Sequence, residues 1–257
     1  MSNDTNLTQG VFATLDTRQQ QALNKQRIYF AHQSVGFDII KGIESVLQAS
    51  SGARLKVVNT RDPADIKGAV LAHMQAGRNY DPLSKITDFV ATLDSGIGKY
   101  VDVAFLKFCY VDITKDTKIE TLLDTYRKEF EILKSNYPKT VFLHFTVPLK
   151  SQDVGLRTKL FHLVGTKTST FLDNQKRNLF NELLVKEFSG IDPIFDLAGI
   201  ESTHPSGRRE TISMNGQTVY SMYPGYTYDG GHLNQLGKLV VANQLLVTLA
   251  KIADRIN

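Results

Sequence analysis

The stretch Arg27-Ile28-Tyr29-Phe30-Ala31-His32-Gln33-Ser34-Val35-Gly36 decides the fold. Its first five residues include an isoleucine and two aromatic side chains, and they predict a short buried strand. The segment from His32 to Gly36 then predicts a tight turn. Beyond it, apolar side chains recur at the spacing of one helical face, namely at Ile39, Ile43, Val46 and Leu47. The repeating unit is therefore a strand, a turn and an amphipathic helix.

The same alternation continues along the chain. We expect further strands at residues 55–59, 101–108, 140–147 and 193–197, and helices at about 86–93, 119–133, 173–188 and 236–252. A long loop that carries Pro63, Gly68, Gly77 and Pro82 is expected after the second strand. Strands that alternate with helices pair in parallel through right-handed crossovers. The sequence thus predicts an α/β fold, a three-layer α/β/α sandwich with a mostly parallel, flavodoxin-like five-stranded sheet.

One segment departs from this alternation. The pair Asn215-Gly216 lies between alternating residues at 211–214 and 217–220, which predicts a β-hairpin with a two-residue turn. We interpret it as a flap inserted into one domain that spans residues 25–257. Residues 1–24 are rich in Thr, Gln and Asn, and are expected to form a tail or a loosely docked helix.

Composition excludes several classes of protein. The 257 residues are 42% hydrophobic and 22% charged, as in folded globular domains. The net charge is only +4 and Arg208-Arg209 is the only adjacent arginine pair, so we expect no nucleic-acid partner. No stretch approaches the roughly 20 apolar residues of a membrane span. Cys109 is the only cysteine, which excludes an internal disulfide and a cysteine-based zinc site. The oligomeric state stays open, and so does the compartment, cytoplasmic or exported.

Ser34 is the first candidate functional residue. It follows the first strand, and ligands of open parallel sheets bind at the carboxyl ends of the strands. It also precedes a helix, whose first backbone N–H groups can stabilise an oxyanion. The alternative is that Ser34 only caps this helix, because serine is a preferred N-cap residue.

A second candidate motif lies just before the final helix. Asp229 and His232 are three residues apart, and Gly230 and Gly231 leave the turn between them free to tighten. In such a turn the carboxylate can hold one imidazole nitrogen while the other nitrogen faces a nucleophile. An early serine after a strand and a late Asp-x-x-His together indicate a serine hydrolase.

This combination resembles the SGNH hydrolases, also called the GDSL-type esterases. Ser34, Asp229 and His232 match the positions and the order of the catalytic residues of that superfamily. The resemblance implies that Ser34 attacks an ester carbonyl, that His232 transfers the proton and that Asp229 orients His232.

The chain also departs from the pattern of this superfamily. The usual Gly-Asp-Ser reads His32-Gln33-Ser34, and the expected Gly-x-Asn-Asp reads Phe108-Cys109-Tyr110-Val111-Asp112, without an asparagine. The resemblance implies three oxyanion donors, and the asparagine is one of them. Gly77 and Asn79 could supply a backbone N–H and an amide, and Tyr110 could supply a phenol. Alternatively, Asn79 only holds a turn and Tyr110 lines the core.

Three residues are candidates for substrate binding. Tyr226 and Tyr228 could stack on a sugar, or belong to a tyrosine-rich surface loop that has no ligand. His32 could line the pocket, or be a hydrogen-bonded structural histidine. The other histidines show no metal-ligand spacing and no Gly-x-Gly-x-x-Gly follows the first strand, so we expect no metal and no cofactor.

These observations predict a serine esterase that removes acetyl or other short acyl groups from a carbohydrate through an acyl-enzyme on Ser34. The substrate would be a small-molecule or glycan ester. One alternative is a polysaccharide O-acetyltransferase, because the same three residues can serve both reactions. A second alternative is a catalytically weak carbohydrate-binding protein on the same fold.

Overall fold

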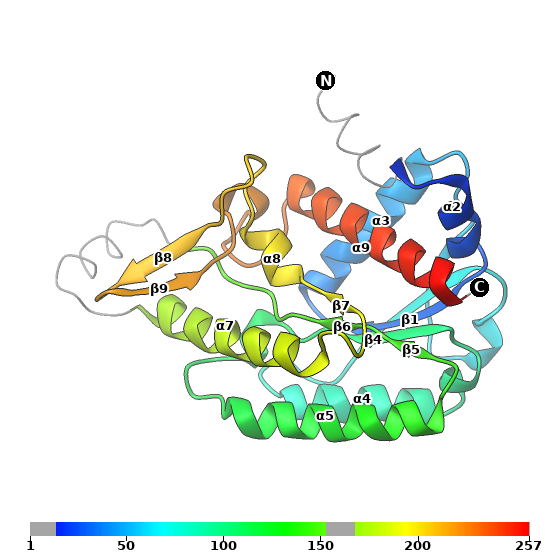
Figure 1. Ribbon diagram of the computed structural model, residues 1–257, viewed down its shortest axis with the longest axis horizontal. Coiled ribbons are helices and arrows are strands. Elements are labelled where there is room, and N and C mark those ends of the chain that lie inside the picture. Colours follow the sequence, from blue (N-terminus) through cyan, green and yellow to red (C-terminus); the bar gives the residue numbers. More distant parts are fainter. Residues whose placement is uncertain (1–13, 153–167, 257) are drawn as a thin grey trace.

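The computed structural model describes residues 14–152 and 168–256 of the chain. Its centre is a parallel sheet of five strands in the order β2-β3-β1-β4-β5 (Figure 1). The strands are β1 (Arg27–His32), β2 (Lys56–Asn59), β3 (Val70–Gln75), β4 (Val103–Leu106) and β5 (Val141–Phe142). In the middle of the sheet Ile28 of β1 pairs with Leu71 of β3 and with Val103 of β4. The predicted parallel α/β architecture is confirmed.

Helices cover both faces of this sheet (Figure 1). Ile28 and Phe30 of β1 pack on the face covered by α3 (Val35–Ala49) and α9 (Gln235–Ile256). Tyr29 and Ala31 pack on the opposite face. That face is covered by α4 (Pro82–Asp94), α5 (Ile119–Asn136) and α7 (Ser169–Phe188). Both faces of β1 are therefore buried, which explains why its sequence is apolar throughout.

Beyond β5 the chain stays extended but pairs with a new neighbour. The N–H of Leu143 donates to the carbonyl of Ala104 in β4, and the N–H of His144 donates to the carbonyl of Pro193. The second bond leads into a parallel pair formed by β6 (His144–Phe145) and β7 (Ile194–Phe195). The strand expected at 140–147 thus pairs with β4 along one edge and with β7 along the other.

Two elements were not predicted. β3 lies in the segment interpreted as a long loop, and it is the strand that separates β1 from β2 in the sheet. Its sequence, Val-Leu-Ala-His-Met-Gln, is short and contains one β-branched residue, while the glycines and prolines around it indicate turns. The helix α8 (Leu197–Ser202) has only six residues, too few for a periodic pattern.

The hairpin was predicted correctly. β8 (Thr211–Met214) and β9 (Gln217–Tyr220) pair antiparallel around Asn215 and Gly216. The φ angles of these two residues are 51° and 74°, the positive values that a type I′ turn requires. The hairpin packs through Ile212, Met214 and Val219 on Phe171 at the start of α7.

The last helix is apolar enough to be considered as a membrane span. An 18-residue window within α9 has a mean hydropathy of 1.4, and 67% of this window is buried inside the protein. The expectation that no stretch of the chain is this apolar was therefore wrong for α9. Its apolar residues pack against α3 and the sheet, as in the core helix of a soluble protein.

Before the sheet, α2 (Thr17–Leu23) packs against α9. Ala22 and Leu23 are buried, and Leu23 belongs to the core on that side of the sheet. Arg18 also forms an ion pair with Asp254 near the end of α9, at 2.5 Å.

Candidate active site

Ser34 lies in the turn between β1 and α3, at the carboxyl end of the central strand. Its φ and ψ angles are 52° and −114°, a combination that non-glycine residues rarely adopt. Its side chain makes no capping bond to α3. Instead, its Oγ lies 2.7 Å from Nε2 of His232. The alternative that Ser34 only caps the helix is therefore wrong, and strain of this kind is typical of functional turns.

The loop before α9 folds around the carboxylate of Asp229. Its Oδ1 accepts hydrogen bonds from the backbone N–H groups of His232, at 2.7 Å, and Gly231, at 2.9 Å. Its Oδ2 lies 2.6 Å from Nδ1 of His232. A carboxylate can only accept a hydrogen bond, so Nδ1 carries the hydrogen. Nε2 is then free to accept a hydrogen bond from the Ser34 hydroxyl. The three predicted side chains thus form one chain of hydrogen bonds.

The pKa of Asp229 is low. Its partial burial raises the pKa, but the hydrogen bonds from the N–H of His232, from the His232 ring and from the N–H of Gly231 outweigh this, and the result is about 2. The carboxylate is therefore ionised throughout the neutral range, which favours a fixed orientation of the imidazole.

Tyr110 packs directly against this loop. Its ring meets the ring of His232 edge to face, with centroids 5.8 Å apart. A Cβ on residue 231 would lie 2.7 Å from the Tyr110 ring, so any larger residue at Gly231 would displace this ring. Burial and the nearby charge of Asp229 raise the pKa of Tyr110 to about 12. The phenol is therefore neutral, and its ring packs against the ring of His232.

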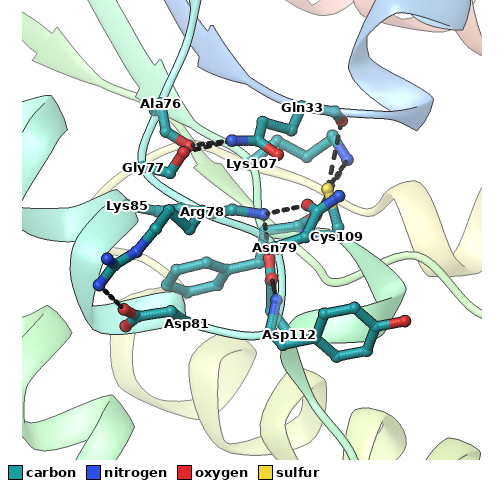
Figure 2. A network of polar contacts seen from close by, with 12 residues as sticks. Gln33, Ala76, Gly77, Arg78, Asn79, Asp81, Lys85, Lys107, Cys109 and Asp112 are labelled. Carbon is teal, nitrogen blue, oxygen red and sulfur yellow. Dashed lines mark hydrogen bonds and ion pairs between the residues drawn. The ribbon is translucent and has the colours of Figure 1, made fainter.

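Gly77 is poorly suited to the role of oxyanion donor. Its backbone N–H donates to Oδ2 of Asp88 at 2.8 Å, so it is already occupied. Gly77 has a φ of +54°, and a Cβ there would lie 2.5 Å from the backbone nitrogen of Lys85. Its carbonyl and that of Ala76 accept hydrogen bonds from the side-chain amide of Gln33 (Figure 2). Gly77 therefore shapes the loop next to Ser34.

Asn79 is placed differently. Its Oδ1 accepts a hydrogen bond from Nζ of Lys85 at 3.0 Å, and its side chain lies at the surface. Among residues 14–152 and 168–256, its Nδ2 has no hydrogen-bond partner, and neither has the backbone N–H of Ser34. These two donors are available to a ligand.

The three expected substrate-binding residues differ in exposure. His32 is fully buried, its Nε2 lies 3.1 Å from Nδ1 of His73, and burial holds its pKa well below the usual value. Tyr226 is 3% exposed and packs edge to face on Tyr223. Tyr228 is 67% exposed, and its ring is stacked on His232 at 5.9 Å. Of the three, only Tyr228 is open to a ligand beside Ser34.

The other histidines have separate partners. His204 bonds to Glu210, and His162 lies outside the described residues. Within the described parts of the chain, no group of three His, Cys, Asp or Glu side chains could hold a metal ion. Two cavities of about 470 and 340 Å³ are both lined by Asp196 and Arg209, and neither is lined by Ser34 or His232. The side chains of His232 and Asp229 are 31% and 42% exposed, so the Ser34 site is open to solvent.

Three residues near the site belong to no sequence motif that would mark them as functional. Lys85 and Asp112 form a buried ion pair beneath Asn79, and Asp38 bonds to the loop that contains His232. A lysine directly before the helix expected at about 86–93 and acidic residues near helix ends are common on protein surfaces. Only the three-dimensional contacts set these three apart.

No family model matches the chain, and no curated protein sequence matches it either. Solved structures do. A GDSL-like lipase from Bacteroides thetaiotaomicron aligns with a TM-score of 0.52 at 11% identity, over 93% of this chain and 94% of its own. A protein described as a putative platelet activating factor from Streptococcus pneumonia aligns with a TM-score of 0.51 at 15% identity, over 89% of each chain. The chain therefore has the fold of the GDSL-like, or SGNH, hydrolases, as the sequence predicted.

Proposed function

We propose that this protein is a serine esterase that forms an acyl-enzyme on Ser34. The observation that carries the proposal is the Ser34 hydroxyl, which lies 2.7 Å from Nε2 of His232 instead of capping α3. The strained backbone of Ser34 and the carboxylate on the far side of His232 add to it. An N-cap serine alone would need neither feature.

Each residue has a distinct role in the proposed reaction. His232 takes the hydroxyl proton through Nε2 while Oγ of Ser34 attacks the ester carbonyl. When the tetrahedral intermediate collapses, His232 returns the proton to the leaving alcohol. A water molecule then attacks the acyl group by the same route, and Ser34 regains its proton. Asp229 stays ionised throughout and stabilises the imidazolium that forms twice in each cycle.

The negative oxygen of the intermediate needs hydrogen-bond donors. The free backbone N–H of Ser34 lies at the start of α3, where the helix dipole adds positive potential. The amide nitrogen of Asn79 is a second donor, and this nitrogen has no hydrogen-bond partner in the described parts of the chain. Each such donor contributes about 3 kcal/mol to the stability of an oxyanion transition state.

Acetylated carbohydrate is the substrate class that we propose. Tyr228 presents its ring beside His232 with 67% of its surface exposed, and exposed aromatic rings provide stacking surfaces for sugars. The side chains of His232 and Asp229 are 31% and 42% exposed, and a site this open to solvent suits a polymer better than a buried acyl chain.

Acetate release from acetylated xylan and from p-nitrophenyl acetate tests this proposal. We expect both activities in the wild-type protein and neither in Ser34→Ala. The matched control is Ser45→Ala on the same helix, and it should keep both activities. In the part of the chain that the structure describes, the Ser45 hydroxyl bonds only to the carbonyl of Lys41.

Two other outcomes decide between the alternatives. Transfer of acetyl to added deacetylated xylan in preference to water would identify an O-acetyltransferase that uses the same residues. Saturable xylan binding that Ser34→Ala does not change, with no product from either ester, would identify a binding protein and overturn the esterase.

A further inference from the structure

We propose that the buried ion pair Lys85–Asp112 positions Asn79 so that its amide serves as an oxyanion donor at Ser34. Asn79 would then replace the asparagine that the chain lacks after β4. This inference rests on the proposed esterase function. It makes Lys85 and Asp112 positioning residues that act through Asn79.

The ion pair joins two elements beneath the loop after β3. Lys85 lies on α4, and Asp112 ends the short 3₁₀ helix Tyr110–Asp112 after β4. Nζ of Lys85 lies 2.5 Å from Oδ2 of Asp112, and both side chains are fully buried. Figure 2 shows Lys85 reaching from α4 toward both Asn79 and Asp112.

The ammonium group of Lys85 fixes the orientation of the Asn79 amide. An ammonium can donate hydrogen bonds but cannot accept them, so the Asn79 atom that faces Nζ at 3.0 Å is the oxygen. The NH₂ group must then point away from Lys85. An asparagine held by a neutral hydroxyl or amide could turn over, whereas one held by a lysine cannot do so without losing a charge-assisted bond.

Asp112 holds the same loop through its backbone. Its Oδ1 accepts the N–H of Tyr80 at 3.0 Å, and its Oδ2 accepts the N–H of Cys109 at 2.6 Å. Tyr80 has a φ of 66° although its side chain is 74% exposed. Its ring is mostly in solvent, so packing does not explain this unfavourable conformation, and the bond to Asp112 does. The loop is therefore held in one shape directly next to Asn79.

The network also reaches the residue before Ser34. The side chain of Gln33 bonds to the carbonyls of Ala76 and Gly77, where the loop begins. The Cys109 thiol donates to the backbone carbonyl of Gln33 at 3.2 Å. In Figure 2, Asn79 is linked to Cys109 through Lys85 and Asp112. The loop that carries Asn79 and the turn that carries Ser34 are thus joined by hydrogen bonds.

A buried ion pair is a weak source of stability. Removing two charges from water costs about as much as their attraction returns, and apolar side chains of similar volume often stabilise a fold better. The pair also makes three polar contacts, to Asn79, Tyr80 and Cys109, and these contacts fix the loop in place. An oxyanion donor needs a fixed direction, and these contacts supply it.

Substitution of Asn79 tests the donor itself. In Asn79→Ala we expect kcat for p-nitrophenyl acetate to fall about 10²- to 10³-fold, with KM changed less than about threefold, because the donor acts mainly in the transition state. Arg78→Ala is the matched control, since among the described residues the side chain of this exposed neighbour pairs only with Asp81. It should keep kcat within about twofold.

A double-mutant cycle tests the positioning role. Lys85→Met leaves Asp112 as an unpaired buried charge, so the cycle also uses K85M/D112N, which removes both charges together. If the pair acts through Asn79, K85M/D112N lowers kcat about 10- to 100-fold in the wild-type background. The same change has no further effect in the Asn79→Ala background, whereas a merely structural role would lower kcat equally in both.

The outcomes separate this inference from the proposed function. If Ser34→Ala keeps esterase activity, the proposed function fails. If Ser34→Ala is inactive but Asn79→Ala keeps its kcat, or if the effects of Asn79→Ala and K85M/D112N multiply fully, this inference alone is overturned. Should K85M/D112N not fold, Asn79→Asp decides: it keeps a partner for Lys85 but removes the donor, and an unchanged kcat would contradict the inference.

Discussion

Asp38 accepts a hydrogen bond from the backbone N–H of Leu233 at 3.1 Å. Asp38 lies in the first turn of α3, which begins directly after Ser34, and Leu233 follows His232 in the chain. Nζ of Lys238, on α9, lies 3.1 Å from the other carboxylate oxygen. This one buried side chain therefore joins the helix that carries the hydroxyl to the loop that carries the imidazole.

Loss of this bond should affect catalysis more than folding. In Asp38→Ala we expect kcat for p-nitrophenyl acetate to fall about 10- to 100-fold, because a displacement of about 1 Å between catalytic groups has effects of this size. Asp38→Asn keeps an oxygen that can accept the N–H of Leu233, and should retain most of the activity. Equal losses in both variants would show that the charge opposite Lys238 matters and the bond to Leu233 does not.

The carboxylate of Asp229 should be needed as an anion. Asp229→Asn keeps the size of the side chain but can no longer stabilise a charged His232, so kcat should fall about 10³- to 10⁴-fold. The pKa of Asp229 is about 2, so it loses its charge only when the pH falls toward that value. Between pH 4 and 9 the kcat/KM profile should therefore contain no step from Asp229. A variant within about tenfold of wild type would contradict this role.

Tyr228 should distinguish a sugar from a simple ester. We expect Tyr228→Ala to raise KM for acetylated xylan about 3- to 10-fold, the value of one aromatic stacking contact, without changing KM for p-nitrophenyl acetate. Tyr100→Ala is the control, because Tyr100 is 46% exposed and lies before the amino end of β4, away from the site. A Tyr228→Ala variant with an unchanged KM for xylan would argue against carbohydrate at this position.

Glu201 should make folding stability depend on pH. Burial raises its pKa to about 8, and the N–H of Leu149 and the charge of Lys107 only partly oppose this. The folded state therefore holds this proton more tightly than the unfolded chain. The contribution to stability is complete below the unfolded pKa, near 4.5, and is lost as the pH rises toward 8.

Urea unfolding between pH 5 and 8 measures this effect. The free energy of unfolding should fall with pH by at most about 1.4 kcal/mol per pH unit. Glu201→Gln, which can still accept the N–H of Leu149, should flatten the dependence. The exposed Glu131 serves as the control, and Glu131→Gln should leave the slope unchanged. A steep slope that persists in Glu201→Gln would assign the titration to another group.

Local patterns were enough to predict most of the fold. The alternation of strands and helices gave a parallel sheet, and Asn215-Gly216 gave the hairpin, because both depend on neighbouring residues. β3 was missed because Val70–Gln75 gains its stability from β1 and β2 on either side, and pairing partners leave no trace in six residues. The hydropathy of α9, in contrast, depends on its sequence alone and was underestimated.

The candidate site was predictable to a smaller extent. A serine after β1 and an Asp-x-x-His before α9 have recognisable positions, and the structure brings Ser34 and His232 together. Lys85 and Asp112 are 27 residues apart, and neither stands in a motif. Their role depends on burial and on contacts with Asn79 and Tyr80, which only the folded chain creates. The sequence left His32 open between a pocket residue and a structural histidine, because its buried partner, His73, lies on the unpredicted strand β3.

The most direct test is covalent labelling with an alkyl fluorophosphonate, followed by peptide mass spectrometry. Serine hydrolases react because their histidine activates the hydroxyl, so one adduct should form in the wild-type protein, on Ser34. His232→Ala should abolish this adduct without unfolding the protein. An unlabelled wild-type protein, or an adduct on another serine that survives in His232→Ala, would contradict the proposed chemistry of Ser34.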